Sequence, residues 1–266
     1  MVTVGQIYDV LNALAPVHYQ MDFDNSGFLV GDRNAEVHTV VTALDITDDV
    51  IHEAIAMNAD LIVSHHPLLF HSLRNVRAED LVGRKVLALA KHDISAICMH
   101  TNLDVADGGV NDALMQALNA EVTGLLEPAG TDDQGQPLGC GRVGTISKPV
   151  PLVAFLKDLT ERLQVSGLRY CDGGKPVHRI AVCGGSGGNM LELAFEAGCD
   201  TFVTADIKYD RFLAAKELDV NLIDADHFCT ENVVVPVLAE TIRNAFPSVN
   251  VRISQALGQT TQFYMP

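Results

Sequence analysis

The stretch VHTVVTALDITDDVIHEAIAMNADLIVSH, residues 37–65, decides the fold class of this 266-residue chain. Two short apolar runs, 37–46 and 59–65, flank a longer amphipathic stretch at 48–59. A buried strand, a helix and a second buried strand in this order are typical of the βα units that build parallel sheets. The stretch therefore predicts an α/β protein rather than a β-sandwich or a helical bundle.

The same alternation continues on both sides of this stretch. ISAICMH (94–100) predicts a third buried strand, and amphipathic periodicity predicts helices at 3–16, 79–92 and 109–120. Residues 124–142 are instead rich in Gly, Pro, Asp and Gln, which supply turn chemistry rather than periodicity. We therefore place a domain junction in that region.

Beyond the junction the βα alternation resumes. Strands are expected at 177–183, 200–206 and 220–226, and helices at 151–164, 189–198 and 230–246. Because the last strand leads directly into a candidate ligand, we expect the C-terminal stretch to return to the first domain. The prediction is two interlinked three-layer α/β domains with mixed sheets. Residues 1–126 form the first, completed by 225–266, and 127–224 form the second.

Composition narrows the classes of partner. The formal charge of -16 repels phosphate backbones and anionic lipid, so nucleic acid is a poor first hypothesis. No apolar run approaches the ~18 residues of a membrane span, and the N-terminus lacks the basic flank of a signal peptide. The six cysteines form no C-x-x-C pair, which favours buried reduced thiols. These features predict a cytoplasmic protein.

LIVSHHPLLF (61–70) is the most informative segment for function. Its apolar strand delivers His65 and His66 to the carboxyl end, where α/β proteins place their ligands. A single loop histidine is more often structural. Two consecutive histidines favour a metal site, because imidazole is the commonest metal ligand and two rings could serve two ions.

ICMHTNLDVADGGVND (97–112) places His100 and Asp104 after another apolar strand. Taken alone, Asp104 and Asp107 are explained by turn formation or helix capping. His100 could ligate a metal, orient a ligand or donate a proton, and we favour a supporting role.

LIDADHFCTENVVVPVLAE (222–240) ends a third strand with His227, and Glu231 follows four residues later. If the helix begins early enough, the two side chains share one face and could share a metal. The structural alternative is that Thr230 caps the helix and Glu231 favours its positive end.

The three strand ends together predict a centre for two divalent ions. Three imidazoles and two carboxylates suit two ions, and a carboxylate can bridge them. Mixed nitrogen and oxygen ligation suits Zn, Fe, Mn, Co or Ni without choosing among them. The expected ligands are His65, His66, Asp104, His227 and Glu231.

Other polar motifs have ordinary structural explanations. CGGSGGNM (183–190) could cradle an anion, but it lacks the lysine of a P-loop, and a tight βα turn explains its glycines. Asp24, Asn25 and Ser26 fit a turn. DIKYDRF (206–212) could place Lys208, Tyr209 and Asp210 near the strand ends, although a solvated helix start is commoner.

These motifs together resemble those of the Ngg-interacting-factor-three-like, or YbgI-like, family, whose members are commonly described as GTP cyclohydrolase 1 type 2 homologs. The motifs that carry the resemblance along nearly the whole chain are DNSGFLVGD, SHHPLLF, HTNLD with GGVND, GGSGG, TADIKYD and HFCTE. The resemblance implies the same five metal ligands, two interlinked α/β domains and a ring-shaped homohexamer.

Two departures distinguish this chain from the family pattern. Asp226 stands before His227 where relatives often have glycine, and Asp210 stands where many have histidine. The resemblance implies a metal-dependent hydrolase acting on a small molecule, with the C8 position of the GTP guanine suggested as the point of attack. The alternative is a non-catalytic metal-binding chaperone or adaptor protein.

Overall fold

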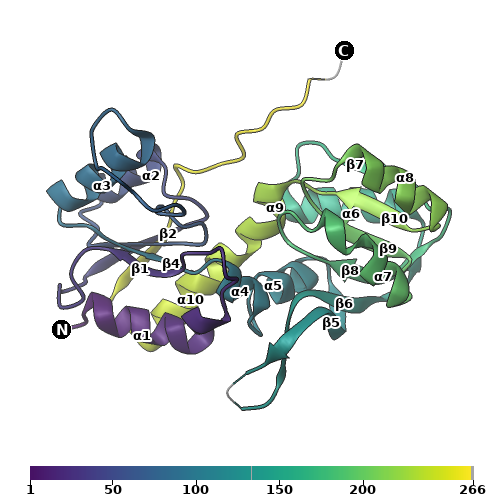
Figure 1. Cartoon of the computed structure of the whole chain (residues 1–266), viewed down its shortest axis with the longest axis horizontal. Coiled ribbons are helices and arrows are strands. Elements are labelled where there is room, and N and C mark those ends of the chain that lie inside the picture. Colours follow the sequence, from purple (N-terminus) through teal and green to yellow (C-terminus); the bar gives the residue numbers. More distant parts are fainter. Residues whose placement is uncertain (133, 265–266) are drawn as a thin grey trace. The chain divides into compact units, whose positions relative to one another are not determined.

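The computed structural model describes residues 1–132 and 134–264 and divides them into two compact units (Figure 1). The first unit comprises Met1–Ala106 and Val234–Gly258. The second unit comprises Asp107–Val233 together with the residues after Gly258. The chain thus leaves the first unit after Ala106, returns to it at Val234 and leaves it again after Gly258, so the two units are interlinked in sequence.

The first unit is built on a mixed sheet in the order β1-β4-β3-β2-β11. β2, β3, β4 and β11 run parallel, and β1 pairs antiparallel with β4 at one edge. The elements of this unit are α1 (Val4–Leu14), β1 (Gly27–Val30), β2 (Thr39–Ala43), α2 (Asp48–Ala56), β3 (Leu61–Ser64), α3 (Leu81–Lys91), β4 (Ser95–Cys98), α4 (Thr101–Val105), α10 (Val235–Ala245) and β11 (Asn250–Ile253).

Helices cover both faces of this sheet (Figure 1). One face packs through Val41 and Ile62 against Ile51 of α2 and Leu89 of α3. α10 lies against β2 and β11 on the other face and packs on α1. β3 is buried along its whole length, as expected of a central parallel strand. The result is a three-layer arrangement.

The second unit is built on a mixed sheet in the order β5-β6-β8-β9-β10-β7. β8, β9 and β10 run parallel, whereas β5, β6 and β7 pair antiparallel with their neighbours. The elements of this unit are α5 (Val110–Ala117), β5 (Ala120–Thr131), β6 (Pro137–Val150), α6 (Leu152–Leu163), β7 (Arg169–Cys171), β8 (Val177–Val182), α7 (Leu191–Glu196), β9 (Thr201–Thr204), α8 (Tyr209–Glu217), β10 (Asn221–Asp224) and α9 (His227–Glu231).

This sheet also has helices on both faces. α5 and α6 pack on one face around Ile180, Val203 and Ile223, while α7 contacts β9 and α8 contacts β10. A buried arginine ties α5 to β6. Arg142 is 1% exposed and donates to Asp112 at 2.8 Å, and Asp107 lies 3.3 Å from the same guanidinium. Breaking such a buried ion pair is costly because it strands a charge.

The α/β class with two mixed sheets is confirmed, but some local expectations are wrong. Residues 124–142, expected to be a junction, lie largely in the long antiparallel pair β5 and β6. The edge strands β1, β7 and β11 were not anticipated. Separately, the compact units change at 106/107, 233/234 and 258/259, and the boundaries expected from sequence are 126/127 and 224/225.

The reason for the missed hairpin is physical. Its side chains are mostly exposed along β5, so hydrophobic periodicity carries little signal there. Its glycines permit close backbone approach: a Cβ at Gly139 would lie 2.3 Å from the Glu127 carbonyl oxygen. Among the residues described, no helix combines the length and apolarity needed to cross a bilayer.

Candidate metal centre

Polar side chains follow three neighbouring parallel strands of the first unit. Asp45 comes shortly after β2, and His65 and His66 directly follow β3. His100 comes shortly after β4 and begins α4 as its N-cap residue. Because parallel strands end at the same edge of a sheet, their topology alone gathers these side chains.

Each of the three histidine rings in this cluster is held through its Nδ1 atom. His65 Nδ1 lies 2.8 Å from the Met99 carbonyl oxygen and therefore donates to it. His66 Nδ1 donates to the Asp45 carboxylate over 2.8 Å. His100 Nδ1 donates to Asp24 over 2.7 Å. Hydrogen bonding at Nδ1 fixes the tautomer in which Nε2 carries the lone pair that a metal accepts.

Asp24 accepts more hydrogen bonds than the other groups that anchor these rings. Its side chain is fully buried and accepts hydrogen bonds from His100, from the Thr101 backbone and hydroxyl, and from the Ser26 hydroxyl. Burial alone raises the pKa of Asp24, but the hydrogen bonds from His100 and Thr101 outweigh it and hold the pKa well below its usual range. Asp24 is therefore an ionised anchor for His100, and more than a turn residue.

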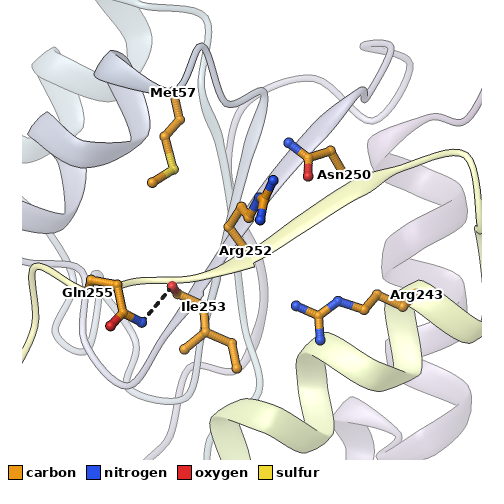
Figure 2. A pocket seen from close by; sticks show the side chains of 6 residues that line it. All are labelled: Met57, Arg243, Asn250, Arg252, Ile253 and Gln255. Atoms are coloured by element: carbon orange, nitrogen blue, oxygen red, sulfur yellow. Dashed lines mark hydrogen bonds between the residues drawn. The ribbon is translucent and has the colours of Figure 1, made fainter.

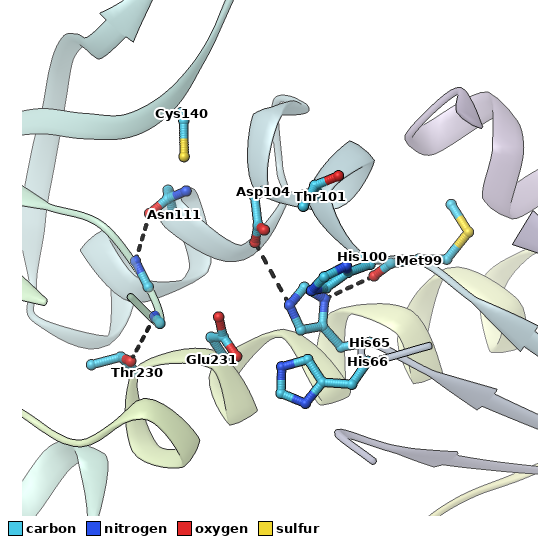
Figure 3. Close-up of polar contacts among 12 residues, drawn as sticks. His65, His66, Met99, His100, Thr101, Asp104, Asn111, Cys140, Thr230 and Glu231 are labelled. Carbon is cyan, nitrogen blue, oxygen red and sulfur yellow. Dashed lines mark hydrogen bonds and ion pairs between the residues drawn. The ribbon is translucent and has the colours of Figure 1, made fainter. Parts of the chain in front are cut away.

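The three rings form a compact group (Figure 3). Ring centroids are separated by 5.0 Å for His65 and His66, 5.3 Å for His65 and His100, and 5.6 Å for His66 and His100. One nitrogen from each ring lies within 4.8 Å of the other two, a spacing that suits a common ion. Asp104 adds a carboxylate oxygen 3.7 Å from His65 Nε2.

The second unit repeats this layout with different residues. The Gly184 turn follows β8, Asp206 follows β9 and His227 follows β10, all on adjacent parallel strands. The helix α9 begins at His227, earlier than the Thr230 cap considered from sequence. His227 and Glu231 therefore share one face, and His227 Nε2 lies 2.9 Å from the Glu231 carboxylate.

Asp226 makes this early start possible. It adopts a φ of 72° and caps the helix, because its carboxylate accepts a hydrogen bond from the Cys229 backbone at 3.1 Å. Asp226 thus has a local structural role. A carboxylate bound to the helix backbone is less available to a metal than one that is not.

His227 lies between two carboxylates of its own unit. Its Nδ1 donates to Asp206 over 2.7 Å, opposite the contact with Glu231. The hydrogen bond with Glu231 raises the pKa of His227 to about 9, helped by Asp206 and opposed by burial. Without a metal this imidazole is therefore protonated at neutral pH, and a divalent ion would replace its Nε2 proton.

The glycine turn after β8 packs directly on this pair. A Cβ at Gly185 would lie 2.1 Å from Glu231 Oε1, and its φ of +64° also disfavours side chains. The Gly185 backbone N–H donates to the Thr230 hydroxyl at 3.1 Å, and Gly184 donates to Asn111 (Figure 3). Close packing against the candidate ligand explains these glycines, and no anion is needed to account for them.

A polar cavity of about 290 Å³ adjoins Asp206 within the second unit. Ser186 and Asn189, from the segment that contains the glycine turn, line one part of this cavity. Lys208 and Asp210, which are exposed at the start of α8, line another. Arg211 lines it too and pairs with Glu192 and Asp210. Asp210, where the family resemblance leads one to expect histidine, therefore lines a cavity next to the group that anchors His227.

A larger cavity of about 570 Å³ lies elsewhere, at the edge strand β11 of the first unit (Figure 2). Its lining includes Arg243, Arg252, Asn250 and Gln255 but none of the candidate ligands. It is therefore distinct from the strand ends that carry the histidines.

The structure places the five expected ligands in two sets. His65, His66 and Asp104 belong to the first unit, and His227 and Glu231 belong to the second. Sequence reasoning missed the anchoring roles of Asp24, Asp45 and Asp206, and it underrated His100, whose ring centroid lies 5.3 Å from that of His65, against 5.0 Å for His66. For Asp45 and Asp206 the available signal was a carboxylate in the loop after a buried strand, whereas Asp24 precedes β1 and carried no such signal.

The donor set fits a divalent metal. Oriented imidazoles and nearby carboxylates are the groups that bind Zn and other borderline ions, and each imidazole has the carboxylate or carbonyl partner that metal-binding histidines ordinarily have. The clusters of His, Asp and Glu could therefore hold a metal ion.

Comparisons with known proteins identify the family. A family model described as Duf34/NIF3 (NGG1p interacting factor 3) matches residues 2–259. A Clostridium acetobutylicum protein named GTP cyclohydrolase 1 type 2 homolog is 34% identical over 249 residues, covering 93% of this chain and 92% of its own. A Streptomyces coelicolor protein of the same name is 35% identical over 235 residues, covering 87% and 82%. The crystal structure of a Staphylococcus aureus hypothetical protein matches with a TM-score of 0.91 at 29% identity, covering 98% and 99% of the two chains.

Proposed function

Because this chain belongs to the Duf34/NIF3 family, we propose that it is a divalent-metal-dependent hydrolase. The ligands that the family resemblance implies for two ions are His65, His66 and Asp104 in the first unit and His227 and Glu231 in the second. The names of its relatives, GTP cyclohydrolase 1 type 2 homologs, suggest a nucleotide as the substrate.

One observation carries the proposal. Three of the five candidate ligands are histidines, and the Nδ1 atom of each donates to an acceptor of its own unit, either a carboxylate or a backbone carbonyl. This arrangement presents Nε2 as the ligand atom and is the usual support of a metal-binding histidine. Histidines with only a packing role would not each need an acceptor at Nδ1.

The residues around these ligands support hydrolytic chemistry. Divalent ions in such a centre supply Lewis acidity and activate water as a nucleophile at neutral pH. On the chain itself, Asp24 orients His100, which is positioned to hold or move a proton at its Nε2 atom. In the second unit, Lys208 and Ser186 line the cavity beside Asp206 and offer a cation and a hydroxyl to a polar substrate.

Metal content and turnover test the proposal together. Wild-type protein loaded with zinc, manganese or iron is expected to hold two ions per chain by elemental analysis. Glu231→Ala and His65→Ala are each expected to lose at least one ion, whereas the control His92→Ala, at the exposed end of α3, should keep both. If Glu231→Ala kept both ions, the ligand assignment would be wrong.

Substrate tests separate the hydrolase from a metal-binding chaperone or adaptor. Loaded protein is incubated with GTP, other nucleotides and phosphoesters, and products are followed by chromatography. Turnover that disappears in Glu231→Ala supports hydrolysis. Two ions without any turnover across this panel would instead favour the non-catalytic function.

The assembly is a further part of the proposal. The family resemblance implies a homohexamer, which light scattering coupled to size-exclusion chromatography would measure as about six times the 28.6 kDa chain mass. A monomeric mass would contradict it.

A further inference from the structure

We propose that Phe23 and Phe70 bind a flat heteroaromatic ring of the substrate, such as a nucleobase, beside the strand ends of the first unit. The inference rests on the proposed function in taking those strand ends as the place of reaction. It adds a substrate class and two binding residues, and both residues belong to the first unit.

Exposure is the first argument. Phe23 is 64% exposed and Phe70 is 38% exposed, although a phenyl ring gains free energy from burial. Their ring centroids lie 6.3 Å apart with the ring planes inclined by 66°, so the two rings form an edge-to-face pair on the surface. Single exposed apolar side chains are ordinary, whereas apolar groups that gather on a surface with polar neighbours mark binding sites.

Location is the second argument. The Phe70 ring centroid lies 4.8 Å from that of His71 and 6.0 Å from that of His100. His100 comes shortly after β4, and its ring centroid is 5.3 Å from that of His65. The aromatic pair is therefore continuous with the group of histidines at these strand ends. A flat ring that stacks on Phe70 would lie next to them.

The rigid attachment of Phe23 is the third argument. Phe23 lies in a turn that is closed by a hydrogen bond from the Asp24 backbone to the Met21 carbonyl oxygen, at 2.9 Å. The Met21 backbone donates to the Thr101 hydroxyl at 3.0 Å, and the Asp24 carboxylate accepts from His100. Both ends of the turn are thus attached to the segment that follows β4.

The loop that carries Phe70 is attached to the same segment of chain. The Asn25 side-chain amide donates to the Leu69 carbonyl oxygen, and Leu68 is buried in the core of the unit. Both rings are therefore held in place by neighbours that are themselves fixed. Rings that are positioned before a ligand arrives lose little conformational entropy on binding, which favours affinity.

The chemistry of the pair selects the ligand. Phenyl rings stack on other flat rings, and this stacking tolerates any base because every base has a π-face. A phenyl ring offers neither a charge nor a hydrogen bond to a ribose or a phosphate. Binding through this pair should therefore depend on the presence of an aromatic ring and only weakly on which base it is.

The test measures binding to the full chain, both loaded with zinc and stripped with EDTA. Guanosine and adenosine 5′-monophosphate are the probes with a ring, and ribose 5-phosphate is the probe without one. Calorimetry gives the Kd, and saturation-transfer NMR shows which ligand protons contact the protein. We expect ribose 5-phosphate to bind at least about 10-fold more weakly than either nucleotide, and the base protons to receive the most saturation.

Three variants and a matched control assign the binding to the pair. Phe23→Leu and Phe70→Leu keep an apolar side chain but remove the aromatic face, so each should raise the Kd of both nucleotides at least about 5-fold. Phe70→Trp should restore it to within about 2-fold of the wild type. Phe195→Leu removes a ring that is 44% exposed in the second unit and should leave the Kd unchanged.

The outcomes separate this inference from the proposed function. An unchanged Kd in both leucine variants, or equal binding of ribose 5-phosphate, overturns the inference. A lower oligomeric mass of either variant by light scattering does so too, because it assigns the rings to a contact between copies of the chain.

The two proposals can also fail one at a time. A chain that holds two ions and hydrolyses a phosphoester but binds no nucleotide overturns the aromatic site and leaves the hydrolase intact. A chain that binds nucleotides through both rings but turns over no substrate supports the aromatic site and contradicts the hydrolase.

Discussion

Each unit carries its candidate ligands at the carboxyl ends of adjacent parallel strands of its own sheet, but the two sets of residues differ in their chemistry. In the first, the ends of β3 and β4 present three histidines, each anchored through Nδ1, and Asp45 after β2 supplies one of the anchors. In the second, the ends of β8, β9 and β10 present a single histidine between Asp206 and Glu231. Adjacent parallel strands thus supply a general platform, and the residues placed on it decide whether the site is rich in nitrogen or in oxygen.

The two clusters also differ in what keeps them in place. The first depends on a buried carboxylate, Asp24, which accepts hydrogen bonds from His100 and Thr101. The second depends on the close approach of Gly185 to Glu231. Electrostatic anchoring and steric fit respond differently to mutation and to pH, which provides ways to test this contrast.

Gly185→Ala should produce the largest effect, in the second unit. The new Cβ would meet Glu231 Oε1 at 2.1 Å, and the residue would also carry a positive φ. We expect a loss of about 3 kcal/mol in the free energy of unfolding, from strain and overpacking together. Urea denaturation measures it.

Gly108→Ala is the matched control for that variant. Gly108 has a φ of +72° but nothing within 4 Å of its Cβ position, so only the backbone term of about 1 kcal/mol applies. Equal losses for the two variants would show that the packing against Glu231 has no importance.

Asp24→Asn should have a smaller effect, in the first unit. The amide is similar in shape, but it weakens the charged hydrogen bonds. It also turns an NH₂ group towards one of the groups that now donate a hydrogen bond to Asp24. We expect a cost of about 2 kcal/mol in unfolding free energy. The control Asp45→Asn, at a half-exposed carboxylate with one hydrogen bond to His66, should cost less than about 1 kcal/mol.

The smallest expected effect is a difference in pH dependence between the clusters in metal-free protein. His227 has its pKa raised to about 9, so its stabilisation is complete below pH ~6.5 and is lost as pH rises through about 9. Asp24 has a lowered pKa, so its stabilisation is present above pH ~4 and is lost as pH falls further.

Unfolding free energies measured in EDTA between pH 3 and 10 check this contrast. Because the His227 side chain is partly exposed, screening reduces its share to about 1 kcal/mol. His227→Gln should remove the alkaline loss and leave the acid loss unchanged. An alkaline loss of full size in that variant would assign it to another group.

Much of the candidate site could be predicted from sequence because strand ends are easy to recognise. Buried runs such as LIVS end abruptly in polar residues, so His65, His66 and His227 were identifiable one segment at a time. Asp24 was not identifiable in this way, since its partner His100 lies 76 positions away. The β5–β6 hairpin was missed for a different reason: β5 is mostly exposed and has no apolar face to mark it, and the glycines of β6 resemble turn residues.

The sequence by itself determined the α/β class, the family pattern and the residue types available to a metal, because these follow from short-range periodicity and from motif order. Only the tertiary structure decided which carboxylate holds which imidazole, that α9 begins at His227, and that His100 stands beside His65 and His66. Those features depend on the pairing of strands distant in sequence, and the spacing of residues along a chain does not encode distances across a sheet.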